Sequence, residues 1–173
     1  MPPGSGGAAP PRGRIFLLDD NPLTVNMIEQ FLLREGFAVA KATDPVEALQ
    51  AELPFAPEVA ILDAMMPGMS GFEFAQALKK ALGSGVRIVM LTALRREADR
   101  QRGLASGADA YLTKPVRPAE LLAAVEAQLA AARGGRAAAA VEDLARILAG
   151  AGTPEEKVRA AAERLAREGS LPG

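Results

Sequence analysis

The sequence contains no cysteine and no histidine. Disulfide bonds, thiolate chemistry and zinc sites built from these two residue types are therefore excluded. The same absences exclude Ser-His-Asp and Cys-His nucleophile pairs. Any chemistry has to rest on Asp, Glu, Lys, Ser or Thr, or on a metal ion bound through oxygen.

Aromatic residues are also few, and neither sign of charge is in large excess. Aromatic residues make up 4% of the 173 residues and Trp is absent, whereas 49% are apolar, so we expect an aliphatic core. The formal net charge of −1 argues against a basic surface for nucleic acid. No apolar run reaches the ~20 residues that span a bilayer, and no signal peptide is recognisable. The sequence therefore predicts a cytoplasmic protein without a membrane segment.

Short apolar runs alternate with helix-like segments between residues 14 and 133, which predicts one domain there. The runs are typical of buried parallel strands and cover residues 14–19, 37–41, 58–63, 86–92 and 109–112. Helices are expected to begin at Pro22 and Pro45 and to cover residues 72–82, 95–106 and 118–132. Strand and helix units in alternation predict an α/β fold with a parallel sheet and helices on both faces.

The two ends of the chain have a different composition. Residues 1–13 are rich in Pro, Gly and Ala, and we expect a flexible leader. Gly134-Gly135 is expected to end the helix that begins near Pro118. Residues 134–173 are predicted to form an Ala-rich extension of two short helices, the second of which begins with a capping box at Thr153.

Polar side chains follow the predicted strands. They are Asp19, Asp20, Asp63, Thr92 and Lys114. Each has a structural explanation when taken alone, since Asp caps helices, Thr is an ordinary strand residue and Lys-Pro is common in loops. Taken together, they would meet at the edge of a parallel sheet where ligands bind.

The combination of these residues predicts a particular chemistry. Three carboxylates repel one another unless a cation binds, and their oxygen atoms suit Mg²⁺ or Mn²⁺. The ammonium group of Lys114 can neutralise an anion at the same edge. We therefore predict a site for an aspartyl phosphate, with one of the carboxylates as the nucleophile.

The chain from about Arg14 to Ala132 resembles the receiver domain of two-component response regulators. The resemblance rests on Asp19-Asp20, Asp63-Ala-Met-Met-Pro-Gly-Met-Ser-Gly71, Thr92-Ala93 and Tyr111-Leu-Thr-Lys114-Pro115. It implies a flavodoxin-like, doubly wound sheet of five parallel strands in the order 2-1-3-4-5. A short C-terminal helical extension would follow this domain.

The resemblance also implies a role for each residue of the site. Asp63 is the phosphoacceptor, and Lys114 contacts the phosphoryl group. Asp20, Asp63 and the backbone carbonyl of Met65 hold Mg²⁺, and Asp19 assists through a water molecule. In this reading the protein is not an enzyme beyond its own phosphorylation and slow dephosphorylation.

Signal output follows from the same resemblance. Thr92 moves to bond the phosphoryl group, and Tyr111 turns inward behind it. An effector protein is then expected to bind the face made by helix 95–106, strand 109–112 and helix 118–132. A sensor histidine kinase or a phosphotransfer protein would supply the phosphoryl group. The resemblance is also compatible with a homodimer.

The lifetime of the phosphorylated state depends on two positions that vary in this family. They are occupied by Met65 and Leu94, neither of which is acidic or an amide. Neither side chain can orient an attacking water molecule. The sequence therefore predicts slow loss of the phosphoryl group.

Three other functions stay open. A haloacid-dehalogenase-like phosphatase needs a second acid two residues after the nucleophile, where this chain has Met65. A degenerate receiver would act only as a docking or dimerisation module. A phospho-regulated transcription factor would bind DNA through residues 134–173, but these carry six basic and six acidic residues and no clear recognition helix, so DNA is not an expected partner.

Overall fold

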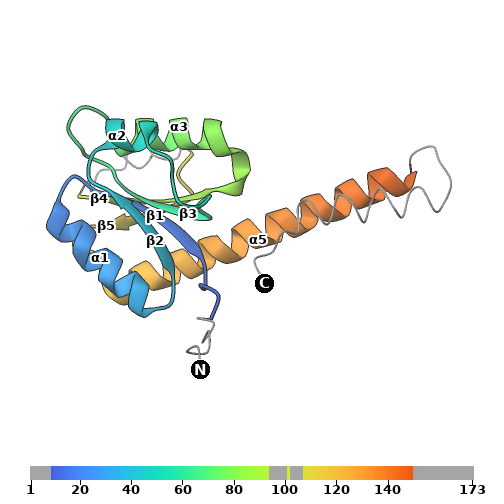
Figure 1. Ribbon diagram of the computed structural model, residues 1–173, viewed down its shortest axis with the longest axis horizontal. Helices are drawn as coiled ribbons and strands as arrows, with labels where there is room; N and C mark the ends of the chain where they lie inside the picture. Colours follow the sequence, from blue (N-terminus) through green and yellow to red (C-terminus); the bar gives the residue numbers. More distant parts are fainter. Residues whose placement is uncertain (1–8, 94–100, 102–106, 150–173) are drawn as a thin grey trace, which may run out of the picture. The chain divides into compact units, whose positions relative to one another are not determined.

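The computed structural model describes residues 9–93, 101 and 107–149 of the chain. Its strands are β1 (Arg14–Leu18), β2 (Ala38–Ala42), β3 (Val59–Asp63), β4 (Arg87–Thr92) and β5 (Ala110–Thr113). Its helices are α1 (Pro22–Arg34), α2 (Pro45–Gln50), α3 (Gly71–Leu82), the short 3-10 helix η1 (Gly83–Gly85) and α5 (Pro118–Ala149) (Figure 1). The chain divides into two compact units, Pro11–Ala132 and a second unit of Met1–Pro10 with Arg133–Gly173.

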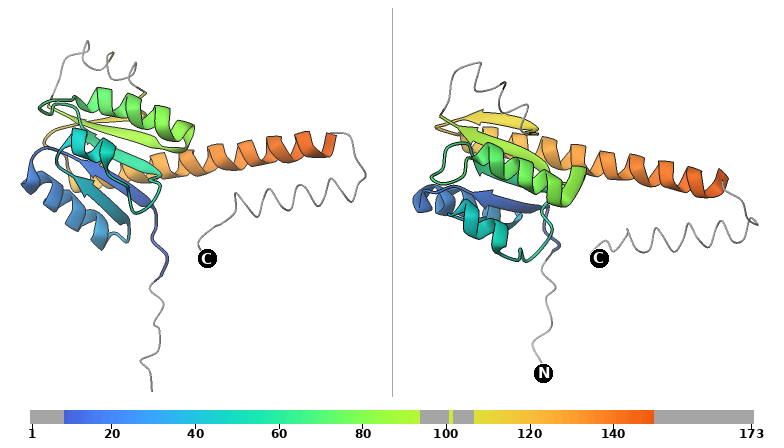
Figure 2. Two further views of the ribbon diagram at one scale, coloured as in Figure 1. Left: turned by 45° about the horizontal axis from the view of Figure 1, so that its top comes forward. Right: turned by 90° about the horizontal axis from the view of Figure 1, so that it is seen from above.

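The first unit is built on one five-stranded sheet in the order β2-β1-β3-β4-β5. All four pairs of neighbouring strands are parallel. Figures 1 and 2 show α2 and α3 on one face of the sheet, with α1 and the first part of α5 on the other. The predicted doubly wound α/β fold and its strand order are confirmed.

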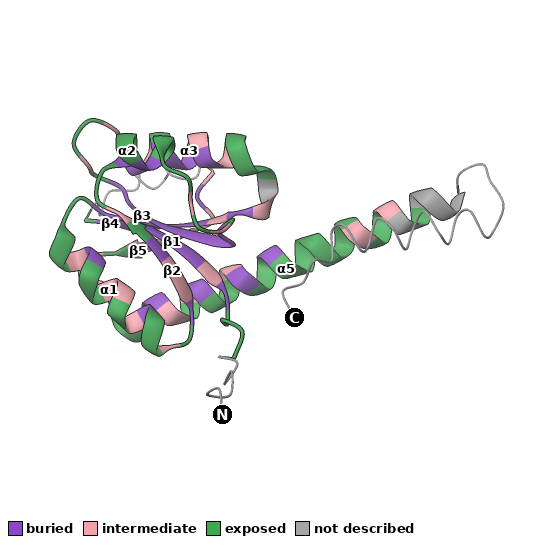
Figure 3. Cartoon of the chain, in the orientation of Figure 1, coloured by how far each residue is buried: buried purple, intermediate pink, exposed green. Residues whose placement is uncertain are grey.

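The core has two layers because successive strand residues point to opposite faces of the sheet. In β1, Phe16 and Leu18 pack on the side of α3, where the Phe16 ring stacks on that of Phe74 with the ring centroids 5.7 Å apart. Ile15 and Leu17 pack on the other side, together with apolar residues of α1 and α5. The three central strands, β1, β3 and β4, are buried along most of their length (Figure 3), as expected for a parallel sheet covered on both faces.

Side-chain caps fix the starts of the helices that follow β1, β2 and β3. The Asn21 side chain accepts a hydrogen bond from the Leu23 N–H at 3.0 Å. Asp44 accepts from the N–H groups of the second and third residues after it, at 2.8 and 2.9 Å. Ser70 and Glu73 form a reciprocal capping box, whose hydrogen bonds lower the pKa of Glu73. The predicted starts at Pro22 and Pro45 are confirmed, while α3 begins at Gly71, one residue before the predicted start.

The prediction that Gly134-Gly135 ends the last helix is wrong, because α5 continues through both glycines to Ala149. Two internal glycines weaken a helix by about 1 kcal/mol each. Four alanines follow after Arg136, from Ala137 to Ala140, and alanine is the strongest helix former. The first predicted helix of the extension is therefore a continuation of α5, and the second lies outside the described residues. No helix in the described part of the chain combines the length and hydrophobicity needed to cross a membrane.

We expect Gly134→Ala and Gly135→Ala each to stabilise the second part of α5 by about 1 kcal/mol. A Cβ atom at either position meets no atom within 4 Å, and neither residue has a positive φ. Slower amide exchange of residues 133–149 is the measurement, with helicity by circular dichroism as a second readout. Gly83→Ala is the control and should destabilise the protein, because Gly83 has a φ of 67°. Unchanged exchange in both α5 variants would contradict the prediction.

Candidate functional site

Three carboxylates meet where β1 and β3 end. Asp19 follows β1 and Asp63 ends β3, and the register pairs Leu18 with Leu62, so these two aspartates are neighbours across the sheet. Carboxylate oxygens of Asp19, Asp20 and Asp63 all lie within 4.8 Å of one another. Asp19 and Asp63 are buried, with 1% and 6% of their surface exposed, whereas Asp20 is exposed. The structure therefore brings the three predicted metal ligands together.

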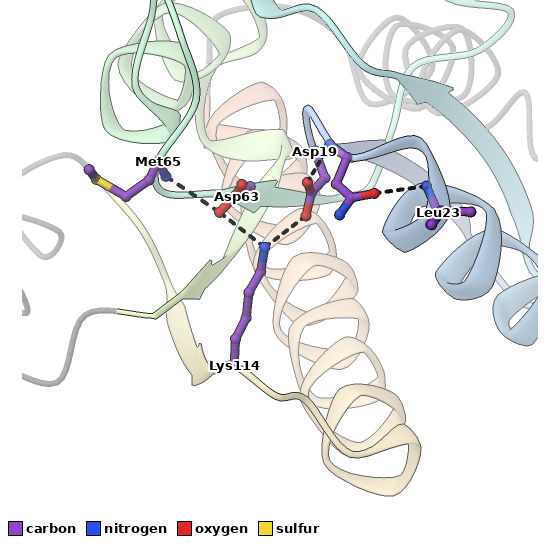
Figure 4. A network of polar contacts seen from close by, with 6 residues as sticks. Asp19, Leu23, Asp63, Met65 and Lys114 are labelled. Atoms are coloured by element: carbon purple, nitrogen blue, oxygen red, sulfur yellow. Dashed lines mark hydrogen bonds and ion pairs between the residues drawn. The ribbon is translucent and has the colours of Figure 1, made fainter.

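Lys114 reaches this cluster from the end of β5, which lies two strands away from β3 in the sheet. It follows β5, where its backbone N–H donates to the Thr92 carbonyl at 2.8 Å. Its Nζ lies 2.9 Å from Asp19 Oδ2 and 3.3 Å from Asp63 Oδ1 (Figure 4). The peptide bond to Pro115 is cis. One ammonium group thus bridges the two buried carboxylates.

The charge at the site is not balanced. Burial raises the pKa of Asp63, and the negative charge of Asp19 raises it further, while Lys114 and the Met65 N–H act in the opposite direction. Burial opposes the charged form of Lys114, but its hydrogen bond to Asp19 and the attraction of both carboxylates raise its pKa overall. Lys114 therefore stays protonated, and ionised Asp63 lies in a surplus of negative charge.

Asp19 and Asp63 differ in how the protein uses their oxygen atoms. One oxygen of Asp19 accepts the Asn21 N–H at 2.9 Å, and the other binds Lys114. Asp63 Oδ1 accepts the weaker Met65 N–H at 3.4 Å. Asp20 is exposed at the same edge. A set of carboxylate oxygens with solvent access fits a hard divalent cation such as Mg²⁺.

The two predicted switch residues lie on β4, the neighbour of β3, and on β5, the edge strand beyond it. Thr92 is the last residue of β4, one position beyond the partner of Asp63 in the register, and it is buried. Tyr111 lies on β5, where its ring packs against the core on the α2 and α3 side and its hydroxyl oxygen is buried. Leu94 and, apart from residue 101, the predicted helix 95–106 lie outside the described residues.

One residue of the site was missed as a functional position by the analysis of the sequence. Gly71 is the first residue of α3, and its N–H donates to the Ala64 carbonyl at 3.1 Å. A Cβ atom at Gly71 would lie 2.0 Å from the carbonyl oxygen of Asp63. The glycine therefore lets α3 approach the backbone of the phosphoacceptor candidate. The motif contained Gly71, but only the folded chain gives the reason.

Comparisons with known proteins agree with this geometry. Residues 15–126 match the model of the response regulator receiver domain. The DNA-binding response regulator MtrA of Mycolicibacterium smegmatis is 43% identical over 118 residues, 68% of this chain and 51% of MtrA. The phosphate regulon transcriptional regulatory protein PhoB of Klebsiella pneumoniae is 40% identical over 116 residues, 66% of this chain and 50% of PhoB.

Solved structures give the same result. The crystal structure of a CheY-like receiver domain protein from Methanospirillum hungatei JF-1 has a TM-score of 0.64 and 28% sequence identity, and the match covers 71% of this chain and 98% of that protein. By contrast, the chain spans about half the length of the two relatives matched by sequence.

Proposed function

The chain belongs to the response regulator receiver family, and from this premise we propose that Asp63 accepts a phosphoryl group in a Mg²⁺-dependent reaction. The observation that carries the proposal is the position of Lys114 Nζ between Asp19 and Asp63 in the acidic cluster. This arrangement supports phosphoryl transfer because it combines a carboxylate nucleophile with a cation that can follow the transferred charge.

In the proposed reaction a carboxylate oxygen of Asp63 attacks the phosphorus atom of the donor. The new O–P bond forms while the bond between phosphorus and the donor breaks. Lys114 exchanges its contact with Asp63 for one with a phosphoryl oxygen, and its 2.9 Å ion pair with Asp19 keeps it near the site. When bound, Mg²⁺ supplies positive charge beside the phosphoryl oxygens.

The proposed output is a change on one face of the domain. A phosphoryl group adds about −1.5 to −2 charges and three acceptor oxygens. Thr92, next to Asp63 on the neighbouring strand, would bond one of these oxygens. We propose that β5, the first part of α5 and residues 95–106 form the surface that reports this change to an effector protein or to a second copy of the chain.

The proposed phosphodonor is a sensor histidine kinase or a phosphotransfer protein. The protein is proposed to catalyse only its own phosphorylation and dephosphorylation. DNA binding is a second candidate function, because the relative MtrA is a DNA-binding response regulator. The equal numbers of basic and acidic residues in 134–173 argue against it, and a gel-shift assay with genomic DNA tests it.

Labelling with radioactive acetyl phosphate tests the proposed function directly. We expect one acid-stable, base-labile phosphoryl group per chain in the presence of Mg²⁺, and its loss when EDTA is added first. Steady release of phosphate from a phosphomonoester would instead support the phosphatase. Absence of any label from acetyl phosphate and from a cognate kinase would support the docking module.

We expect Mg²⁺ to stabilise the folded protein, because it relieves the repulsion between the three carboxylates. A ligand present at 100 times its Kd contributes about 2.7 kcal/mol, which a thermal shift assay measures as a rise in Tm. The Asp20→Asn variant should lose most of this rise. Asp44→Asn is the matched control, since Asn and Asp are similar helix caps and Asp44 caps α2. An equal rise in both variants would exclude Asp20 as a ligand.

The phosphorylated state is expected to be long-lived. Met65 lies two residues after the acceptor and is 60% exposed, but its thioether is a poor hydrogen-bond acceptor for an attacking water molecule. We expect the purified phosphoprotein to persist for minutes to hours after the donor is removed. Loss of label within seconds would contradict this prediction.

A further inference from the structure

Met65 differs from the other methionines near the phosphorylation site. Met66 and Met69, in the same loop, pack against the core. Met90 in β4 is fully buried, with 0% of its surface exposed. Met65 is 60% exposed and extends into solvent. Its sulfur atom is therefore accessible to small oxidants, whereas that of Met90 is shielded.

The backbone of Met65 is part of the site. Its N–H lies 3.4 Å from Asp63 Oδ1. The side chain extends away from Asp63 (Figure 4). It is unbranched, has three rotatable bonds, and is mostly in solvent, and exposed side chains change rotamer within picoseconds to nanoseconds. Rotation can therefore bring the end of the side chain towards the phosphorylated carboxylate.

We propose that Met65 is a site of reversible oxidation by peroxide, and that its oxidation shortens the lifetime of the aspartyl phosphate. The second part rests on the proposed function. In the reaction, the Met65 sulfur attacks one oxygen of hydrogen peroxide, so that an S–O bond forms and the O–O bond breaks. The sulfur is oxidised to a sulfoxide, the other peroxide oxygen leaves as water, and a methionine sulfoxide reductase with thiol as reductant reverses the change.

Oxidation supplies the group that the site lacks. A thioether sulfur accepts hydrogen bonds weakly, whereas a sulfoxide is polar and carries an oxygen acceptor. At Met65 this oxygen can accept a hydrogen bond from a water molecule that attacks the phosphorus atom. One hydrogen bond of ordinary strength gained in the transition state corresponds to about fivefold faster hydrolysis.

The first experiment maps oxidation in the full chain. The protein is treated with dilute hydrogen peroxide, and sulfoxide formation at each methionine is followed over time by mass spectrometry of peptides. We expect Met65 and the 73% exposed Met27 to oxidise at least about tenfold faster than Met90. Methionine sulfoxide reductase should remove the oxygen from Met65. Oxidation of Met65 no faster than that of Met90 would overturn the proposal.

The second experiment measures the lifetime of the phosphoryl group. Each protein is divided, one half is oxidised and freed of peroxide, and both halves are labelled with acetyl phosphate before the donor is removed. Wild type and Met27→Leu should lose the label about fivefold faster after oxidation. In Met65→Leu the two halves should decay at the same rate, whereas untreated Met65→Gln should decay faster than untreated Met65→Leu. The same acceleration in oxidised Met65→Leu and oxidised wild type would overturn the proposal.

The two experiments separate the failure of this proposal from failure of the proposed function. If untreated wild type takes no label, the proposed function fails, and the effect on lifetime fails with it. The oxidation map still decides whether Met65 is a modification site. If untreated wild type is labelled and its lifetime does not change after Met65 is oxidised, only the inference about Met65 is wrong.

Discussion

The Asp63→Asn variant is expected to take no phosphoryl label from acetyl phosphate, a loss of at least about 100-fold relative to wild type. A neutral amide oxygen is a far weaker nucleophile than a carboxylate, and the variant also removes one negative charge from the proposed cation site. Asp44→Asn, which changes an aspartate that caps α2, should be labelled like wild type. Label on Asp63→Asn at the wild-type level would place the acceptor elsewhere.

The same variant should be more stable than wild type when Mg²⁺ is absent. The pKa of Asp63 is raised in the folded protein, so the folded state binds this proton more tightly than the unfolded state does. Its contribution to stability is therefore greatest below the ordinary pKa of an aspartate and is lost as the pH rises through the raised pKa. At neutral pH the amide of Asp63→Asn carries no charge, so the variant avoids this loss of stability. We expect a higher Tm for Asp63→Asn in EDTA and the reverse order with Mg²⁺, and a lower Tm in EDTA would contradict this reading of the charge balance.

Gly71→Ala is expected to destabilise the protein by about 3 kcal/mol or more. The added Cβ atom would lie 2.0 Å from the carbonyl oxygen of Asp63 and 3.0 Å from Ala64 Cα. Both of these are backbone atoms, so no side-chain rotation relieves the clash. Either α3 or the end of β3 has to move, and phosphorylation should fall together with stability. Denaturant unfolding and acetyl phosphate labelling measure the two effects.

Gly68→Ala is the matched control in the same loop. Gly68 has a φ of 82°, but its Cβ position meets no atom within 4 Å. Its cost is therefore limited to backbone strain, about 1–2 kcal/mol. If Gly71→Ala were no more destabilising than Gly68→Ala, the close approach of α3 to Asp63 would not be a constraint on the fold.

Comparison of α1 with α5 shows why one helix boundary could be predicted and another could not. The start of α1 depends on Asn21 and Pro22, which are neighbours in the sequence and act locally through a cap and a fixed φ. Whether α5 ends at Gly134-Gly135 or continues depends on a balance between two helix-weakening glycines and the helix-favouring alanines that come after them. That balance is spread over several turns of the helix, so the local stop signal at Gly134-Gly135 gave the wrong result.

The sequence by itself determined the alternation of strands and helices, the parallel sheet with helices on both faces and the identity of the polar residues at the strand ends. These features follow from hydrophobic periodicity and from the rule that parallel strands place their carboxyl ends on one edge. Only the tertiary structure decided how these residues interact. It places Lys114 between two buried carboxylates and brings Gly71 against the Asp63 carbonyl, and it separates exposed Met65 from the buried Met90. Distances and burial of this kind arise from segments far apart in the chain, so no local pattern encodes them.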